Sequence, residues 1–256
     1  MDIENKYGTL QTQQALLVLL KEFDRFCEVH QIVYSLDSGT LLGAIRHGGF
    51  IPWDDDIDVI MDRANFEKFC SLDFSGTSII RERSLWIERV RLIPEQAEKL
   101  QCPITPTLDV FILDQASNNP LMRKITNLLI RLLQGMMKKK PDYASFSLKN
   151  KIMLFITYQL GHCFSDQLKY KWYHQLASRC RNKSARYLTC YFYPFHEIGR
   201  LFRTDSLEVI EKHQFEDALF CIMSRYDAYL TELYGDYMTP PPVEDRIPFH
   251  ISESLK

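Results

Sequence analysis

Residues 54–58 contain four aspartates, and they lead into a segment where acidic and apolar residues alternate. Because successive side chains of a strand point to opposite faces, Asp56 and Asp58 are expected on the same side. Two carboxylates at that spacing repel each other, and their oxygens are ligands that Mg²⁺ prefers. The pair therefore predicts a divalent-cation site. Asp54 and Asp55 are interpreted as residues outside the ligand set, with Asp55 pointing to the other face.

A turn of small residues, Ser38-Gly39-Thr40, precedes these aspartates. It lies between an apolar run at residues 32–36 and a helical pattern that starts at Leu41. Backbone N–H groups at the start of a helix can hold a phosphate, and glycine lets that phosphate approach the backbone closely. One end of the segment is thus expected to bind phosphate and the other to bind metal, as metal-assisted chemistry on a phosphate requires.

Other kinds of site also use aspartates at this spacing. An EF-hand calcium loop is rejected, because Val59 falls where the sharp turn needs glycine and Asn65 falls where a bidentate glutamate should be. A glycosyltransferase, which holds a sugar nucleotide through Asp-x-Asp and a metal, stays as the alternative enzyme class. A nucleotide-binding protein without turnover is the least favoured reading, given the turn at Ser38 and a further aspartate at position 109.

Residues 36–61, LDSGTLLGAIRHGGFIPWDDDIDVIM, closely resemble the conserved block of the LicD family. Members of that family transfer phosphocholine and related alcohol phosphates from a cytidine diphosphate donor to cell-envelope glycans. The run Leu108–Asp114 is similar to the family strand that carries a third aspartate, and a weaker similarity covers residues 215–241. The resemblance implies an α/β (α+β) protein with a nucleotidyltransferase-like mixed sheet core and a mostly helical second half.

The resemblance also implies a mechanism. Asp56, Asp58 and Asp109 would hold one or two Mg²⁺ ions, with Mn²⁺ as a second option, and Asp109 would orient or deprotonate the attacking hydroxyl. The implied donor is a cytidine diphosphate alcohol, with phosphocholine favoured and ethanolamine, glycerol or ribitol phosphate left open. The implied acceptor is a glycan or lipid-linked oligosaccharide of lipopolysaccharide, capsule polysaccharide or a teichoic acid precursor.

Several residues near the turn and the aspartates are expected to bind substrate, and each also has a structural reading. Arg46 and His47 either stabilise a helix end or contact the donor phosphate or the acceptor. Trp53 either packs against the sheet or offers its face to a quaternary ammonium. His250 either returns to the active site or lies on the surface. The predicted substrate-binding set is Ser38, Gly39, Thr40, Arg46, His47 and Trp53.

Hydrophobic periodicity predicts a catalytic core over residues 1–115 and a mostly helical region over 116–256. The second region is expected to complete the cleft, to select the acceptor and to pack as one unit with the core. Helices are predicted at 10–30, 38–46, 64–70, 121–137, 146–164, 166–181 and 221–234. Strands are predicted at 32–36, around Asp56, and at 78–82, 85–92, 108–113, 187–193 and 197–202.

Composition limits the partners and the compartment. With 31 basic and 33 acidic side chains the formal net charge is −2, so no nucleic-acid partner is expected. Seven scattered cysteines without a CxxC pair argue against a disulfide framework or a structural zinc site. The polar N-terminus and the interrupted apolar windows predict a cytoplasmic protein without a membrane span. Lys138-Lys139-Lys140, between apolar helices, forms either a solvated helix end or a peripheral contact with an anionic membrane.

Overall fold

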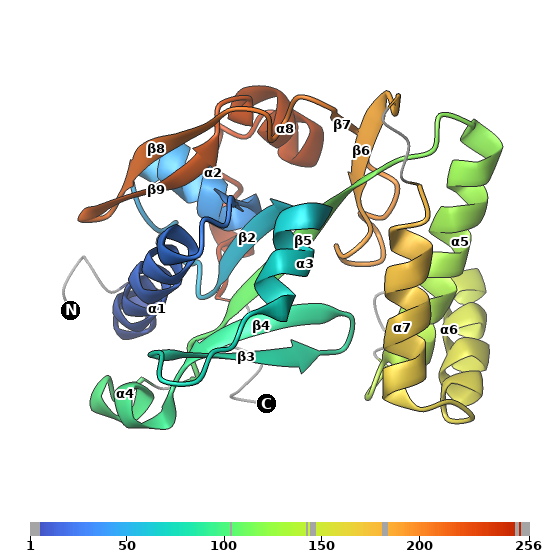
Figure 1. Cartoon of the computed structure of the whole chain (residues 1–256), viewed down its shortest axis with the longest axis horizontal. Helices are drawn as coiled ribbons and strands as arrows, with labels where there is room; N and C mark the ends of the chain where they lie inside the picture. The colour runs from blue at the N-terminus through green and yellow to red at the C-terminus, as the bar shows by residue number, and fades with distance from the viewer. Residues whose placement is uncertain are drawn as a thin grey trace. The chain divides into compact units, whose positions relative to one another are not determined.

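The computed structural model describes residues 6–102, 104–141, 143, 147–180, 184–248 and 251, and His250 therefore lies outside the described residues. The chain is a mixed α/β protein, which confirms the predicted fold class (Figure 1). By its internal contacts it divides into two units. The first comprises residues 1–82, 88–111 and 205–256, and the second comprises residues 83–87 and 112–204. The predicted division into residues 1–115 and 116–256 stays a prediction.

The sheet of the first unit follows the order β1-β2-β5-β4-β3. In strand β2, between β1 and β5, Ile57 and Met61 are fully buried, and the acidic residue between Ile57 and Val59 stays half-buried. Val59 and Ile60 are fully buried as well, so only Asp58 and the terminal Asp62 of this strand keep exposed surface. The strands are β1 (Ser35–Leu36), β2 (Ile57–Asp62), β3 (Ile79–Ser84), β4 (Ile87–Leu92) and β5 (Leu108–Gln115), and residues at the ends of the last three belong to the second unit.

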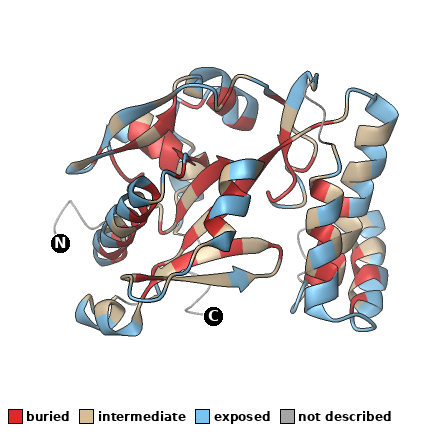
Figure 2. Ribbon diagram, viewed as in Figure 1, coloured by how far each residue is buried: buried red, intermediate tan, exposed pale blue. Residues whose placement is uncertain are grey.

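The helices of the first unit follow the predicted apolar patterns. α1, the dark blue helix of Figure 1, buries a stripe that includes Leu16, Leu19, Phe23 and Phe26. Figure 2 colours such buried residues red. α2 packs on β2, β1, β8 and α8, and α3 packs on β2. The helices are α1 (Leu10–Val29), α2 (Ser38–His47), α3 (Arg63–Ser71), α4 (Pro94–Lys99) and α8 (Tyr226–Tyr234). The predictions for α1, α2 and α3 are confirmed, whereas α4 was not predicted.

A β-hairpin replaces the first part of the predicted C-terminal helix. The prediction that a helix begins at Cys221 is wrong, because Cys221 pairs with Lys212 across the hairpin of β8 (Ile210–Phe215) and β9 (Ala218–Met223). A short apolar run such as 218–223 does not distinguish a buried helix from a strand by its periodicity alone. The helix α8 begins only at Tyr226.

The second unit contains three helices and a short antiparallel extension of β5. α5 (Pro120–Met137) packs against α6 (Leu148–Gly161) and α7 (Asp166–Ala177), as predicted for this helical region (Figure 1). β6 (Tyr187–Cys190) pairs with residues 113–115 of β5 and with β7 (Phe202–Arg203). The strand predicted at 197–202 is therefore wrong except for its last residue. None of the described helices combines the length and apolarity needed to cross a membrane.

Candidate active site

Neighbouring strands bring the predicted aspartates together. Asp58 lies on β2 and Asp109 on β5, and these strands are adjacent in the sheet. Asp56 lies one residue before β2, and the buried Ile57 between Asp56 and Asp58 leaves both carboxylates half-buried. Burial raises the pKa of Asp58 well above its ordinary value, and the charges of Asp56, Asp109, Asp37 and Asp54 raise it further. The five carboxylates thus form one electrostatic cluster, called here the aspartate cluster.

Asp54 is closer to this cluster than the sequence suggested. Burial raises its pKa well above the ordinary value, followed by the charge of Asp56 and a hydrogen bond to it. The Oδ2 atom of Asp54 is buried and has no hydrogen-bond partner in the described protein. Asp55 points elsewhere: it is 3% exposed, and its Oδ2 accepts a hydrogen bond of 2.7 Å from the backbone N–H of Ile251. Asp55 is therefore not solvent-facing.

Arg89 is a charged partner of the cluster that sequence reasoning missed. It stands directly opposite Asp109 in the antiparallel pairing of β4 and β5. Its guanidinium donates two hydrogen bonds to the Asp109 carboxylate, from Nε at 2.6 Å and from Nη2 at 3.1 Å. Burial lowers the pKa of Arg89, but the hydrogen bond and charge of Asp109 more than offset it, so the pKa is raised overall. The signal available in the sequence was the predicted strand through Glu88-Arg89-Val90, in which Arg89 points to the opposite face from its two neighbours.

The cluster fits a divalent cation in charge and in donor chemistry. Carboxylate oxygens are the ligands of hard cations such as Mg²⁺ and Mn²⁺, and an unsatisfied buried oxygen such as Asp54 Oδ2 favours a counter-ion. Within the described residues, no three acidic, histidine or cysteine side chains already stand as a set of metal ligands. The pairing of Asp109 with Arg89 is one physical reason, because the guanidinium takes both oxygens of that carboxylate.

The first turn of α2 has an unusual backbone. Ser38 adopts a left-handed φ of 47°. Residues other than glycine rarely take this backbone conformation, and such residues cluster at functional sites. Asp37 before it is fully buried, and its Oδ1 accepts a hydrogen bond of 2.9 Å from the hydroxyl of Tyr229 on α8. The backbone N–H of Asp37 donates to the carbonyl of Asp58 at 2.9 Å, so the start of α2 is attached to β2.

Gly39 and Thr40 are also tied to the aspartates. A Cβ at Gly39 would lie 2.8 Å from Oδ2 of Asp54, so the space beside this glycine is next to the cluster. The hydroxyl of Thr40 accepts a hydrogen bond of 3.0 Å from the backbone N–H of Asp58. The structure therefore places Ser38, Gly39 and Thr40 beside the acidic residues, as the sequence pattern implied.

Arg46, His47 and Trp53 lie in a second group of contacts. Arg46 Nη1 donates 2.6 Å to the carbonyl of Tyr237, and burial, followed by the charge of Arg246, lowers its pKa. Burial, followed by the charge of Arg46, lowers the pKa of His47. The His47 ring lies 6.4 Å from Trp53, centroid to centroid, in an edge contact. The guanidinium of Arg246 lies over the Trp53 ring, 5.0 Å from its centroid.

Comparison with known proteins identifies the family. Residues 31–129 match the family model described as "LicD/FKTN/FKRP, nucleotidyltransferase domain". The chain is 31% identical over 269 aligned residues to the lipopolysaccharide cholinephosphotransferase LicD of Haemophilus influenzae. The alignment covers 96% of this chain and 97% of that protein. The chain belongs to the LicD family. This confirms the predicted family and, at that level, the predicted LicD-type phosphotransferase class.

Shorter similarities link this LicD family member to two uncharacterized proteins. They come from Rickettsia prowazekii and Rickettsia typhi, and each is 47% identical over 45 residues. The match covers 18% of this chain and 17% and 15% of the two proteins, respectively.

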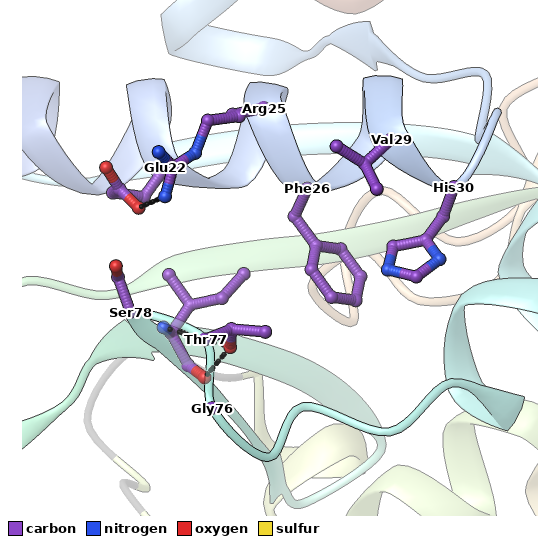
Figure 3. Close-up of a pocket in the computed structure, with 9 residues that line it drawn as sticks. Glu22, Arg25, Phe26, Val29, His30, Gly76, Thr77 and Ser78 are labelled. Carbon is purple, nitrogen blue, oxygen red and sulfur yellow. Dashed lines mark hydrogen bonds and ion pairs between the residues drawn. The ribbon is translucent and has the colours of Figure 1, made fainter.

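The structure also has a cavity of about 330 Å³ whose lining contains none of the predicted site residues. It is formed by the C-terminal half of α1 and by residues 76–79 before and at the start of β3 (Figure 3). Phe26 and His30 point from the helix toward the turn, and Glu22 and Arg25 form an ion pair of 2.8 Å at one end. None of the residues that line this cavity belongs to the aspartate cluster or to the first turn of α2.

Proposed function

We propose that this protein transfers phosphocholine from cytidine diphosphate choline to a hydroxyl of a cell-envelope glycan. The observation that carries the proposal is the match to a lipopolysaccharide cholinephosphotransferase along nearly the whole chain. The aspartate cluster supports it, because a diphosphate donor brings the cations that such a cluster can bind. The acceptor favoured by the relative is lipopolysaccharide; capsule polysaccharide and teichoic acid precursors present hydroxyls of the same chemistry.

The reaction is a displacement at phosphorus. An acceptor hydroxyl oxygen forms a bond to the phosphorus that carries choline, and the bond from that phosphorus to the bridging oxygen breaks. Cytidine monophosphate leaves, and the hydroxyl proton passes to a base. Asp109 is the proposed residue to orient or deprotonate the hydroxyl, and Arg89 fixes the position of its carboxylate through two hydrogen bonds.

Asp56, Asp58 and Asp109 are the proposed ligands of Mg²⁺, with Mn²⁺ as a second option, and Asp54 adds a fourth carboxylate at the same place. A bound cation would neutralise the diphosphate and the leaving group. The residues themselves supply a dense negative charge, and burial followed by the charges of the neighbouring aspartates raises the pKa of Asp54 and Asp58. The turn Ser38-Gly39-Thr40 is proposed to hold a donor phosphate at the start of α2.

Trp53 is the proposed contact for the choline headgroup. Its ring already lies beneath a cation, the guanidinium of Arg246, at 5.0 Å. A quaternary ammonium binds aromatic faces in the same way. Arg46 and His47, which lie near this ring, are proposed to contact the donor phosphate or the acceptor.

The proposed place of action is the cytoplasmic face of the membrane, where lipid-linked glycan acceptors would be reached from the aqueous side. The Haemophilus influenzae relative is a lipopolysaccharide cholinephosphotransferase by name, and lipopolysaccharide is a lipid-anchored glycan. Lys138, Lys139 and Lys140 are exposed, as a peripheral contact with anionic lipid requires.

A donor panel tests the function. The purified protein is incubated with Mg²⁺, an envelope glycan acceptor and either a cytidine diphosphate alcohol or a sugar nucleotide, and nucleotide release is measured. We expect cytidine monophosphate from the choline donor, and Trp53→Leu should raise KM more for the choline donor than for the glycerol donor. Turnover of sugar nucleotides alone would establish a glycosyltransferase and overturn the proposal.

A further inference from the structure

α5 and α6 each have an exposed face that carries apolar side chains. Leu121 is 64% exposed and Leu148 is 74% exposed. On each helix the exposed apolar residues recur at spacings of three and four, so they form a continuous stripe. The stripes consist of Leu121, Ile125, Leu128 and Leu129 on α5 and of Leu148, Ile152, Phe155, Ile156 and Leu160 on α6.

These stripes are not needed to pack the two helices together. The opposite sides of the helices are buried, with Ile130 and Met137 on α5 and Leu154 and Thr157 on α6. A Cβ at Gly135 of α5 would collide with the side chain of Thr157, so the two helices already approach closely beyond the C-terminal end of the α5 stripe. In Figure 2 the N-terminal half of α5 has only the exposed and intermediate colours, and the buried residues of this helix lie in its C-terminal half.

The segment that carries the stripes is strongly basic. Between residues 115 and 165 the sequence has eight basic side chains and one acidic one, whereas the whole chain has a net charge of −2. Two of the basic side chains are engaged with the backbone: Arg123 donates to the carbonyl of Ser117, and Arg131 donates to that of Ile198. The exposed lysines of the segment are Lys124, Lys138, Lys139, Lys140 and Lys149.

We propose that the outward stripes of α5 and α6 form a docking surface for an anionic lipid bilayer. The leucine, isoleucine and phenylalanine side chains would enter the boundary between headgroups and acyl chains, and the lysines would contact lipid phosphates. A second copy of this chain is a poorer occupant, because it would bring one strongly basic surface against another. The surface deepens the proposed function, since it would bring the enzyme to a lipid-linked acceptor.

Vesicle sedimentation of the full chain, without any substrate, tests the surface. The vesicles contain phosphatidylcholine either alone or with about one-third phosphatidylglycerol, at low and at high salt. We expect binding to the anionic vesicles that weakens at high salt. The triple variant Leu128→Ser, Ile152→Ser, Phe155→Ser should bind at least tenfold more weakly, and Lys138→Glu, Lys139→Glu, Lys140→Glu should lose the salt-sensitive part of binding.

A matched control changes exposed apolar residues of the other unit. Val209→Ser, Leu219→Ser, Val243→Ser alters side chains that are 58%, 55% and 57% exposed, and it should bind like the wild type. All variants alter exposed positions, and unchanged circular dichroism and thermal unfolding will verify that they fold.

Three results would overturn the docking surface: no binding by the wild type at low salt, equal losses in the control and the Leu128 triple variant, or a wild-type dimer that the Leu128 variant converts to monomer. Turnover with a short soluble acceptor is measured in parallel. If the wild type binds vesicles but does not turn over the choline donor, the proposed function fails and the docking surface stands. If turnover is normal but vesicles do not bind, the docking surface fails and the proposed function stands.

Discussion

At the scale of single residues, the main property of the candidate site is its high density of negative charge. Burial disfavours ionisation of Asp58 and raises its pKa, and the charges of four neighbouring aspartates, Asp56, Asp109, Asp37 and Asp54, add to the effect. Arg89 compensates Asp109 directly, through its two hydrogen bonds. The remaining carboxylates carry charge that a bound cation would relieve, which ties the stability of the site to the ligand it is proposed to bind.

Removing one carboxylate should therefore separate activity from stability. Asp58→Asn is expected to lower turnover at least about a hundredfold, because a proposed ligand is lost, while the free energy of unfolding stays the same or rises by about 1 kcal/mol. Steady-state kinetics and urea unfolding measure the two quantities. Asp62→Asn is the control on the same strand, since asparagine can keep the cap that Asp62 Oδ1 provides to the N–H of Asn65. Near-normal turnover of Asp58→Asn would remove this residue from the site.

Arg89 offers a second test at this scale. Arg89→Met should lower the free energy of unfolding by about 1–3 kcal/mol, because Asp109 loses two charge-assisted hydrogen bonds. Added Mg²⁺ should restore more stability to this variant than to the wild type, because the vacated carboxylate can then bind the cation. Arg91→Met is the control: its ion pair with Glu82 is more exposed and should contribute about 0–1 kcal/mol. Equal effects of the two variants, with no response to Mg²⁺, would contradict a special role for Arg89.

At the scale of elements, α2 carries Ser38, Gly39 and Thr40 at its start and connects them to the rest of the candidate site. It packs on the loop that follows it through Gly43, where a Cβ would collide with the backbone carbonyl of Gly49. That loop is held from the other side, since the carboxylate of Glu216 accepts a hydrogen bond of 2.9 Å from the N–H of Phe50. The position of α2 thus depends on backbone contacts that leave no room for side chains.

Gly43→Ala should accordingly displace α2. The collision is with backbone, which cannot move aside as a flexible side chain can, so a loss of about 1–3 kcal/mol in unfolding free energy is expected together with weaker donor binding. Calorimetric titration with the donor and thermal unfolding measure both effects. Gly48→Asn is the control: Gly48 has a φ of 70° but open space around it, and asparagine tolerates that conformation. Wild-type stability of Gly43→Ala would contradict the packing argument.

The sequence predicted those elements whose signal lies within one segment. The helix of α2, the alternation around Asp58 and the strand of Asp109 each have a clear local pattern, and the neighbouring strands confirm their arrangement. The hairpin at 210–223 was missed because β8 exposes consecutive polar residues and shows no alternation. Arg89 and Asp37 were missed for another reason: their importance comes from partners on other elements, Asp109 and Tyr229, that only the folded chain brings near.

At the scale of the whole molecule, the C-terminal residues complete the first unit. Tyr229 contacts Asp37, Tyr237 contacts Arg46, and Arg246 covers Trp53, so three separate positions of the site receive a partner from beyond residue 205. These contacts join residues that are about 190 positions apart in the sequence. The candidate site is therefore a product of the complete first unit, although its conserved-looking motif occupies a short stretch near the N-terminus.

The most direct test follows both phosphorus atoms of the donor. Phosphorus NMR is recorded on cytidine diphosphate choline with the protein, Mg²⁺ and a lipid-linked envelope glycan. Transfer predicts that the diphosphate signals decline while cytidine monophosphate and a new phosphodiester on the glycan grow in equal amounts, and that neither grows with Asp58→Asn or with a chelator present. An unchanged diphosphate, or release of free phosphocholine in place of the phosphodiester, would contradict phosphocholine transfer by the aspartate cluster.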